Sequence, residues 1–207
     1  MVVSMTIQII RTTCVAILLG LTGSNVIAAQ GDVLVRVRAL HVAPDVSTNK
    51  TLSTLNTGVK QSTVPELDFT YMFTDRIGAE LILGVTRHRV TSNAGSLGKV
   101  SLLPPTLTLQ YHFNPEGQFR PYVGAGINYT RFYNNRLSAG GQRVNIDRNS
   151  FGPALQAGID IGIDKNWFVN VDVKKLWIRT DTSLGGTHLG TLKIDPWLVG
   201  VGFGRRF

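Results

Sequence analysis

Strict alternation of apolar and polar side chains along residues 103–113 constrains the fold of this chain more than any other sequence feature. From Pro105 onward, apolar residues occupy every second position, and Thr, Gln and His stand between them. A period of two places the two sets on opposite faces of a β-strand. After a turn at residues 114–119 the alternation resumes, with Val123, Ala125, Ile127 and Tyr129 on one face. The two segments therefore predict a hairpin with one apolar and one polar face.

The same pattern recurs along the chain and predicts eight antiparallel strands. The other six begin near Val33, Glu66, Ile77, Leu155, Trp167 and Trp197. Each is near the ~9–11 residues that a tilted strand needs to cross a bilayer. The connections alternate between long, at about 21, 11, 17 and 13 residues, and short, at about 3, 6 and 3, as in outer-membrane barrels. We expect the long ones, residues 43–63, 91–101, 134–150 and 180–192, to be polar loops.

Composition separates this fold from its alternatives. Hydrophobic residues make up 43% and charged residues 16% of the 207 residues. Beyond the N-terminus no apolar run approaches the ~20 residues of a membrane helix. A soluble lipocalin-like barrel shares the period of two, but its interior is apolar and its connections do not alternate in length. The prediction is one all-β domain, residues 30–207, an eight-stranded antiparallel transmembrane β-barrel with long outer loops and short periplasmic turns.

Residues 1–29 are predicted to be a secretory signal peptide. Arg11 precedes a short apolar core at residues 15–21, and Ala28 and Ala29 offer a small-residue cleavage site. The alternative, a membrane anchor, needs a longer apolar core. The only cysteine, Cys14, leaves with the peptide, so the mature chain needs no disulfide in the oxidising periplasm. We expect export to the outer membrane of a Gram-negative bacterium.

The polar faces of the strands predict a charged lumen. Its cluster comprises Arg36, Arg38, Glu66, Asp68, Glu80, Asp160, Asp172 and Lys174. Eight strands leave room for side chains or one small ligand, which excludes a wide water-filled pore. Confined charges must be paired or hydrated. A plug of ion pairs and a conducting path both remain open.

Two further sets of residues gather at strand ends. Aromatic residues predict girdles at the two membrane interfaces: Tyr71, Phe73, Tyr111, Phe113, Tyr129, Trp167, Trp177 and Trp197. The alternative is ordinary core aromatics. Basic residues predict an outer rim that meets lipopolysaccharide phosphates: Arg87, Arg89, Lys99, Arg131, Arg136, Arg143, Arg148 and Arg179. The alternative is a solvated rim without a partner.

Catalysis and nucleic-acid binding have little support in the sequence. The four histidines, His41, His88, His112 and His188, are scattered and show no metal-ligand spacing. We expect no enzyme activity, no cofactor and no metal. The net charge of +8 suits nucleic acid, but a signal peptide argues against that partner.

Three segments resemble the OmpW family of small outer-membrane barrels. The first two are Leu-Pro-Pro-Thr-Leu-Thr-Leu-Gln-Tyr-His-Phe at residues 103–113 and Arg-Pro-Tyr-Val-Gly-Ala-Gly at residues 120–126, and the third is residues 197–207. The resemblance extends over essentially the whole mature chain. It implies passive uptake of small hydrophobic molecules from outside, with release sideways into the membrane. It also implies a ligand path in the outer half of the barrel, near Leu40, Met72 and Ile82.

The last strand also carries a signal for the barrel-assembly machinery, in which we place Phe203 and Phe207. Arg205 stands where an apolar residue is usual, and its position at the interface lets it snorkel. A second function class stays open beside uptake. It is a structural or surface-interaction barrel with a closed, ion-paired lumen and no transport.

Overall fold

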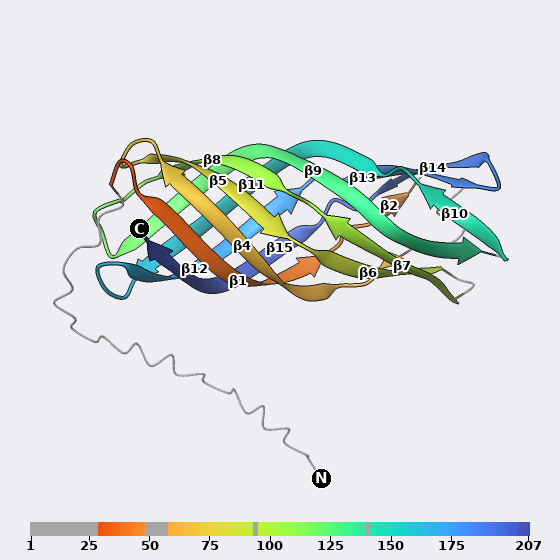
Figure 1. Cartoon of the computed structure of the whole chain (residues 1–207), viewed down its shortest axis with the longest axis horizontal. Helices are drawn as coiled ribbons and strands as arrows, with labels where there is room; N and C mark the ends of the chain where they lie inside the picture. The colour runs from red at the N-terminus through yellow and green to blue at the C-terminus, as the bar shows by residue number, and fades with distance from the viewer. Residues whose placement is uncertain (1–28, 49–57, 93–94, 140) are drawn as a thin grey trace, which may run out of the picture.

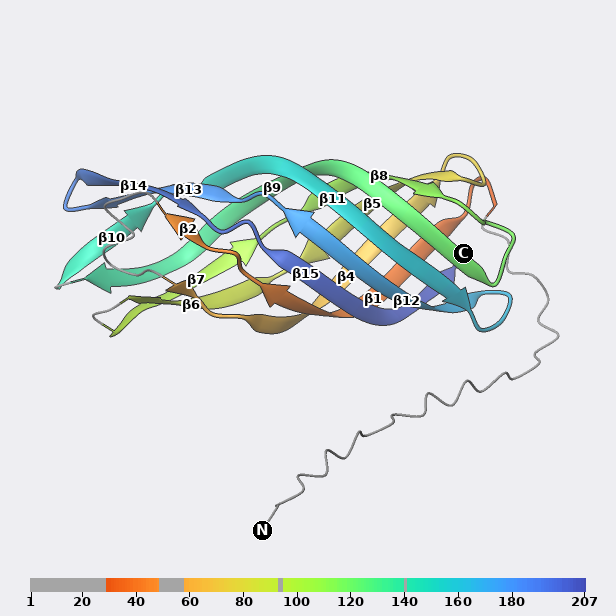
Figure 2. The ribbon, with the colours of Figure 1, turned by 180° about the vertical axis from the view of Figure 1, so that it is seen from behind.

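The structure is a computed structural model that describes residues 29–48, 58–92, 95–139 and 141–207. Residues 1–28 of the predicted signal peptide lie outside this range. Eight strands pair antiparallel with their neighbours in a closed ring (Figures 1 and 2). They are β1 (Val33–Ala43), β4 (Ser62–Met72), β5 (Ile77–Gly84), β8 (Thr106–His112), β9 (Phe119–Ala139), β11 (Asn149–Gly162), β12 (Trp167–Leu176) and β15 (Trp197–Arg206). The eight-stranded barrel is therefore confirmed.

Short turns join the strands at one end of the barrel, where both termini of the described chain also lie (Figure 1). We call this the turn end. At residues 73–76 the Thr74 hydroxyl accepts hydrogen bonds from the amides of Arg76 and Ile77. At residues 163–166 the Asp164 carboxylate accepts them from Asn166 and Trp167. Such side chains satisfy turn amides locally, which suits short connections.

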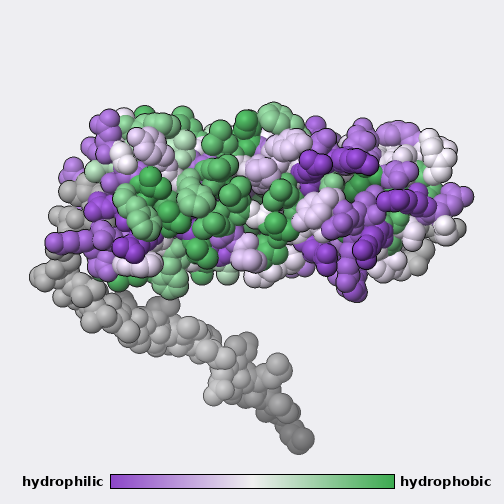
Figure 3. All heavy atoms as spheres, viewed as in Figure 1, coloured by the Kyte–Doolittle hydropathy of each residue, from purple (hydrophilic) through white to green (hydrophobic). Residues whose placement is uncertain are grey.

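The outward face of the ring is an apolar belt. Leu81, Leu107, Leu109, Val201 and Phe203 are each between 42% and 61% exposed. On the face seen in Figure 3, hydrophobic surface covers the middle of the barrel strands, with hydrophilic surface at both ends. Such a large exposed apolar surface is stable only against lipid. Among the described residues, no helix is long and apolar enough to cross a membrane.

The predicted polar loops are wrong in large part, because the chain continues as strands beyond the apolar belt. The additional strands are β2 (Ser47–Thr48), β3 (Gly58–Val59), β6 (Thr86–Ser92), β7 (Gly95–Leu103), β10 (Gln142–Ile146), β13 (Arg179–Leu184) and β14 (Thr187–Lys193). With the last part of β9 they pair in the order β3-β6-β7-β9-β10-β13-β14-β2. We call this part the extension; it lies opposite the turn end (Figure 1).

The extension was missed because the alternation inverts where it begins. On β9 the inward position changes from Thr130 to Phe132, and the outward position changes from Tyr129 to Arg131. On β12, inward Lys174 is followed by inward Leu176. Inside the belt, lipid surrounds the wall and polar groups must turn inward. Beyond it, water surrounds the wall and apolar groups must turn inward instead.

Candidate binding chamber and its charged floor

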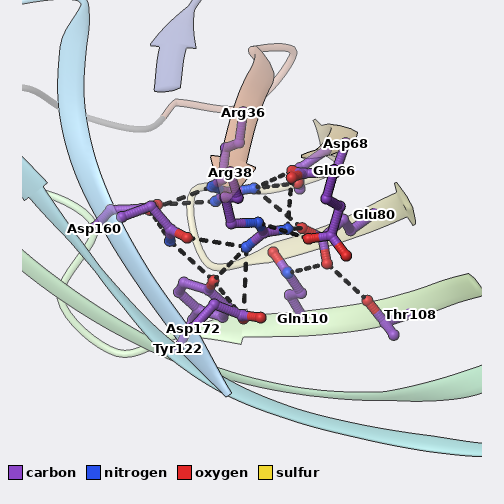
Figure 4. Close-up of polar contacts among 12 residues, drawn as sticks. Arg36, Arg38, Glu66, Asp68, Glu80, Thr108, Gln110, Tyr122, Asp160 and Asp172 are labelled. Carbon is purple, nitrogen blue, oxygen red and sulfur yellow. Dashed lines mark hydrogen bonds and ion pairs between the residues drawn. The ribbon is translucent and has the colours of Figure 1, made fainter. Parts of the chain in front are cut away.

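The eight charged residues expected in the lumen lie together inside the barrel, each at most 4% exposed. Figure 4 labels all of them except Lys174. We call them the charged floor. Arg36 of β1 reaches three carboxylates, with nitrogen–oxygen distances of 2.9 Å to Asp160, 3.2 Å to Asp68 and 3.4 Å to Glu80. Its Nε also donates to Asp160, so this pair is bidentate. Bidentate pairs are the strongest form of this contact.

Arg38, two residues further along β1, binds the other side of the same carboxylate group. Its nitrogens lie 2.5 Å from Asp68, 2.8 Å from Glu66 and 2.9 Å from Glu80. Lys174 of β12 closes the cluster at 2.8 Å from Glu66 and 2.6 Å from Asp172. Every charge of the floor is therefore paired, which is the condition for burying it.

Neutral side chains fill the gaps between these charges. The Tyr122 hydroxyl donates to Asp172 at 2.9 Å, and the Gln110 amide donates to Glu80 at 2.9 Å. Arg36 also donates to the Thr70 hydroxyl at 2.7 Å. The sequence pattern did not single out Tyr122. The floor is a plug of ion pairs and hydrogen bonds, one of the two arrangements left open by the sequence.

Glycines on β15 provide the space for two neighbouring arginines. Gly200, Gly202 and Gly204 face inward, opposite Leu40, Arg38 and Arg36 in the β1–β15 register. A Cβ on Gly204 would stand 2.2 Å from Cζ of Phe168 and 3.0 Å from Cγ of Arg36. A larger residue there would displace the packing beneath the floor.

Met72 lies on the turn-end side of the floor, so its assignment to an outer ligand path is wrong. It packs with Leu34 and Phe168 in a small apolar cluster, and its register partner is Gly78, at the start of β5. The direction of β4 explains the position of Met72. This strand runs from the extension to the turn end, so its last inward residue lies at the turn end.

The extension encloses an apolar chamber of ≈ 120 Å³. Its wall includes Val90, Val100, Leu102, Phe132, Leu137, Val144, Leu192 and Ile194. Leu40 belongs to the same apolar cluster. Ile82 is buried between Asp68 and Thr106 in the strand registers and does not line the chamber. Of the three residues expected on the ligand path, the structure places only Leu40 with the chamber's apolar cluster.

The barrel wall has an interrupted ladder between the floor and the chamber. Ile82 pairs with Thr106, and Thr86 pairs with Leu102, in one continuous register. The three residues on each strand between these pairs are not paired with each other. Gly84 stands opposite Pro104 in this register, and Pro104 has no N–H to donate across it, while Pro105 faces β9. This stretch is a weak point in the wall beside the chamber.

The eight basic residues of the predicted rim are all exposed on the extension or at its base. Four of them, Arg131, Arg136, Arg143 and Arg148, border a hollow of ≈ 500 Å³ together with asparagines of β9 and β10. The Arg143 guanidinium donates to the Asn135 carbonyl at 3.4 Å. Within the described part of the chain, no carboxylate lies in ion-pair distance of these four.

The predicted girdle residues occupy strand ends, as the sequence suggested. Tyr71, Phe73, Tyr111, Phe113 and Trp167 are exposed near the turn end, and Tyr129 and Trp197 are exposed near the extension. Trp177 is half-buried between β12 and β13.

The residues of the predicted assembly signal face outward at the end of the chain. Phe203 is 61% and Phe207 65% exposed. The Arg205 guanidinium stacks on Phe207 and Trp167, with 4.8 Å and 5.4 Å to the ring centroids. These cation–π contacts hold the arginine among the aromatic rings.

Comparison with known proteins gives the family. The model of the OmpW family matches residues 29–207. The chain belongs to this family. Outer membrane protein W of Escherichia coli is 36% identical over 198 residues, 90% of this chain and 93% of that protein. The crystal structure of the outer membrane protein OprG from Pseudomonas aeruginosa superposes with a TM-score of 0.76 at 28% identity, over 89% of this chain and 98% of that chain.

Two other relatives of this OmpW-family barrel match a shorter part of the chain. The uncharacterized outer-membrane protein y4mB of Sinorhizobium fredii is 50% identical over 153 residues. That match covers 70% of this chain and 66% of the relative, slightly under two thirds of its length. The dibenzothiophene metabolism operon protein DoxH of a Pseudomonas species is 35% identical over 148 residues, 68% of this chain and 69% of that protein.

Membership of the OmpW family makes the chain an outer-membrane β-barrel. In such barrels the short turns face the periplasm, so the extension faces the outside. No group of three or more His, Cys, Asp or Glu side chains suited to a metal ion occurs in the described ranges. The prediction of a non-catalytic protein agrees with its membership of this family.

Proposed function

We propose that the chain is a passive uptake protein for small hydrophobic molecules. This proposal rests on one observation: an apolar chamber lies next to the charged floor, on its extension side. Transfer of an apolar molecule from water into this chamber is favourable, because its apolar surface is removed from water. The floor opposes further passage of the molecule along the barrel axis. Passage would require buried ion pairs to separate, and leaving one buried charge without its partner costs about 3–5 kcal/mol.

The ligand therefore leaves sideways, through the interrupted ladder beside Gly84, Pro104 and Pro105. Few backbone hydrogen bonds have to break there, and lipid on the other side is a favourable destination for an apolar molecule. The name of DoxH, a dibenzothiophene metabolism operon protein, supports a hydrophobic substrate class.

Filling the chamber tests this function. Val90 is 4% exposed and lines the chamber, so Val90→Trp occupies its space. Val199 is 49% exposed on the lipid face of β15. The matched control is therefore Val199→Trp, which makes the same substitution on the outer surface of the barrel. In cells that lack the native chain, toluene uptake should fall to background with Val90→Trp and persist with Val199→Trp, at equal levels of heat-modifiable protein. Full uptake by the Val90→Trp variant would contradict the chamber route.

The sideways exit has its own test. Replacing Pro104 by Thr restores a backbone donor on the side of Gly84 and lets the ladder close, whereas Pro105, whose carbonyl accepts from the Tyr129 amide, faces β9. Toluene uptake should then fall, while toluene binding to the purified chain persists. An unchanged uptake rate would show that molecules leave by another route.

We also propose that the arginine-bordered hollow binds phosphate groups of lipopolysaccharide. The favouring observation is four exposed guanidiniums without a carboxylate partner among the described residues, around one hollow. Arginine forks match phosphate geometry. Arg143→Gln with Arg148→Gln should weaken binding of bisphosphorylated lipid A, whereas Arg89→Gln, on β6, should not. Equal binding by all variants would leave the rim as a solvated surface.

A further inference from the structure

The residues just before β1 are hydrogen-bonded into the turn end of the barrel. The Gly31 amide donates to the Met72 carbonyl at 2.8 Å, and the Met72 amide donates to the Asp32 carbonyl at 2.9 Å. At the start of β1, Val33 and Phe207 exchange two backbone hydrogen bonds, at 3.0 Å and 2.9 Å. These residues therefore belong to the barrel, and the first residue of the mature chain must precede them.

A tight turn holds both backbone polar groups of Ala29. The Asp32 amide donates to the Ala29 carbonyl at 3.1 Å, and the Ala29 nitrogen donates to Oδ2 of Asp32 at 2.7 Å. Gly31 has a φ of 92° in this turn, a left-handed conformation that glycine adopts without strain. Asp32 thus fixes the position of the Ala29 nitrogen.

The carboxylate of Asp32 lies in a partly shielded, charged environment. Nη1 of Arg206, at the end of β15, lies 3.6 Å from the same Oδ2, and the two side chains are only 21% and 23% exposed. A carboxylate can accept several hydrogen bonds, so it can serve both partners. The distance of 2.7 Å from Oδ2 to the Ala29 nitrogen is in the range of a charge-assisted N–H···O contact.

We propose that signal peptidase cleaves the chain between Ala28 and Ala29, and that the new α-ammonium group of Ala29 forms an ion pair with Asp32. Hydrolysis breaks the C–N bond, the hydroxyl of water joins the Ala28 carbonyl carbon, and its proton joins the Ala29 nitrogen. An α-amino group has a pKa of about 7.7–8, so this nitrogen is largely protonated at neutral pH. A neutral donor thereby becomes a cation beside a carboxylate, which fastens the N-terminus to the closing seam of the barrel. The inference is independent of the uptake function.

Cleavage one residue later is the competing choice, and it is less favourable. It would remove both contacts of Ala29 and leave the Asp32 amide without its acceptor. The new N-terminal nitrogen would be that of Gln30, which lies 2.9 Å from Oδ1 of Asp75. Asp75 is exposed, and ion pairs of exposed carboxylates contribute little to stability.

The sequence before the bond agrees with this choice. Small side chains at the first and third positions before the scissile bond are typical of signal peptidase sites. Cleavage after Ala28 places Ala28 and Val26 at these positions. Cleavage after Ala29 would place Ile27, a larger side chain, at the third position.

The cleavage site is tested on the complete precursor of 207 residues, produced in a Gram-negative host. The heat-modifiable form is purified from the outer membrane for N-terminal sequencing and intact mass measurement. The sequence should begin Ala-Gln-Gly-Asp, and the mass should be that of residues 29–207. A chain that begins at Gln30, or at any residue other than Ala29, would overturn the assignment.

The ion pair is tested by removing the α-amine chemically. Pyridoxal phosphate transaminates the N-terminal amine of the urea-unfolded mature chain to a ketone, and the chain is then refolded in lipid vesicles. The treatment should raise the equilibrium constant for unfolding by about two- to fivefold in the native chain, the range of a partly exposed ion pair. It should have the same effect in the control Asp75→Asn and none in Asp32→Asn.

Two results would contradict the ion pair: no effect of the treatment on the native chain, or an equal effect in Asp32→Asn. If Asp32→Asn does not refold, Asp75→Asn still decides. Persistence of the effect in that variant supports the pair with Asp32, and its absence there would assign the ammonium to Asp75 and overturn the inference.

Discussion

Neutralising Asp160 should strongly destabilise the folded barrel. Its two oxygens accept from Nε and Nη2 of Arg36 at 3.3 Å and 2.9 Å, and one also accepts from the Asn170 amide at 2.7 Å. Asp160→Asn preserves the shape and removes the charge. Each charge-assisted hydrogen bond contributes about 1.5–3 kcal/mol, and loss of one partner of a buried ion pair costs about 3–5 kcal/mol. Because Arg36 retains Asp68 and Glu80, we expect a loss near the lower limit, about 3 kcal/mol.

Equilibrium urea unfolding in lipid vesicles, followed by tryptophan fluorescence, measures this free energy of unfolding. Asp147→Asn is the matched control, because Asp147 is exposed in the extension and its carboxylate lies outside the ion-paired cluster. The control should stay within about 0.5 kcal/mol of the native chain. An Asp160→Asn barrel as stable as the control would refute the claim that the floor's ion pairs hold the barrel together.

The same variant separates the two transport routes. A hydrophobic molecule that leaves through the side wall never crosses the floor, so folded Asp160→Asn protein should still take up toluene. Loss of uptake without loss of stability would instead favour an axial polar channel.

Three further predictions concern other parts of the chain. Deleting Phe207 should lower the yield in the outer membrane and leave periplasmic aggregates; unchanged assembly, measured by heat-modifiable migration, would contradict a role in the assembly signal. Gly204→Ala should cost about 1–3 kcal/mol in unfolding experiments, because its Cβ meets Phe168 at 2.2 Å, whereas Gly200→Ala, with nearest contacts at 3.3 Å, should cost less than 1.5 kcal/mol. His88 has a pKa below its usual 6.5, so its stabilising contribution is complete above pH 6.5 and is lost as the pH falls through the lowered pKa. Melting temperatures between pH 7.5 and 5 should therefore decrease less in His88→Phe than in the native chain, and parallel curves would exclude this contribution.

Much of the charged floor could be predicted from the sequence. Alternation placed Arg36 and Arg38 on the inward face of the first strand and Glu66 and Asp68 on that of its neighbour, and cross-strand pairing brings such residues together. The two pairs are indeed opposite in register, Arg36 with Asp68 and Arg38 with Glu66. The bidentate contact of Arg36 with Asp160 of β11 was not predictable, because it spans the lumen between strands that are not neighbours.

The chamber could not be predicted in the same way. Most of Gly95 to Leu103 and all of Gln142 to Ile146 fall in segments that were read as polar loops. Their inward positions are nevertheless apolar at Val100 and Val144. A search for the alternation with its polarity reversed would have found these strands.

The sequence by itself determined the barrel: the number of its strands, their order and the face that each side chain occupies. It could do so because lipid outside and polar side chains inside impose a period of two on every strand. Only the tertiary structure decided where the wall passes from lipid to water, since the same period continues across that boundary with its polarity reversed. The extension, the apolar chamber and the position of Met72 beneath the floor depend on this boundary and on strand direction. They arise from contacts between residues far apart in the chain, and the alternation within each strand does not show where the boundary lies or which segments meet across the chamber.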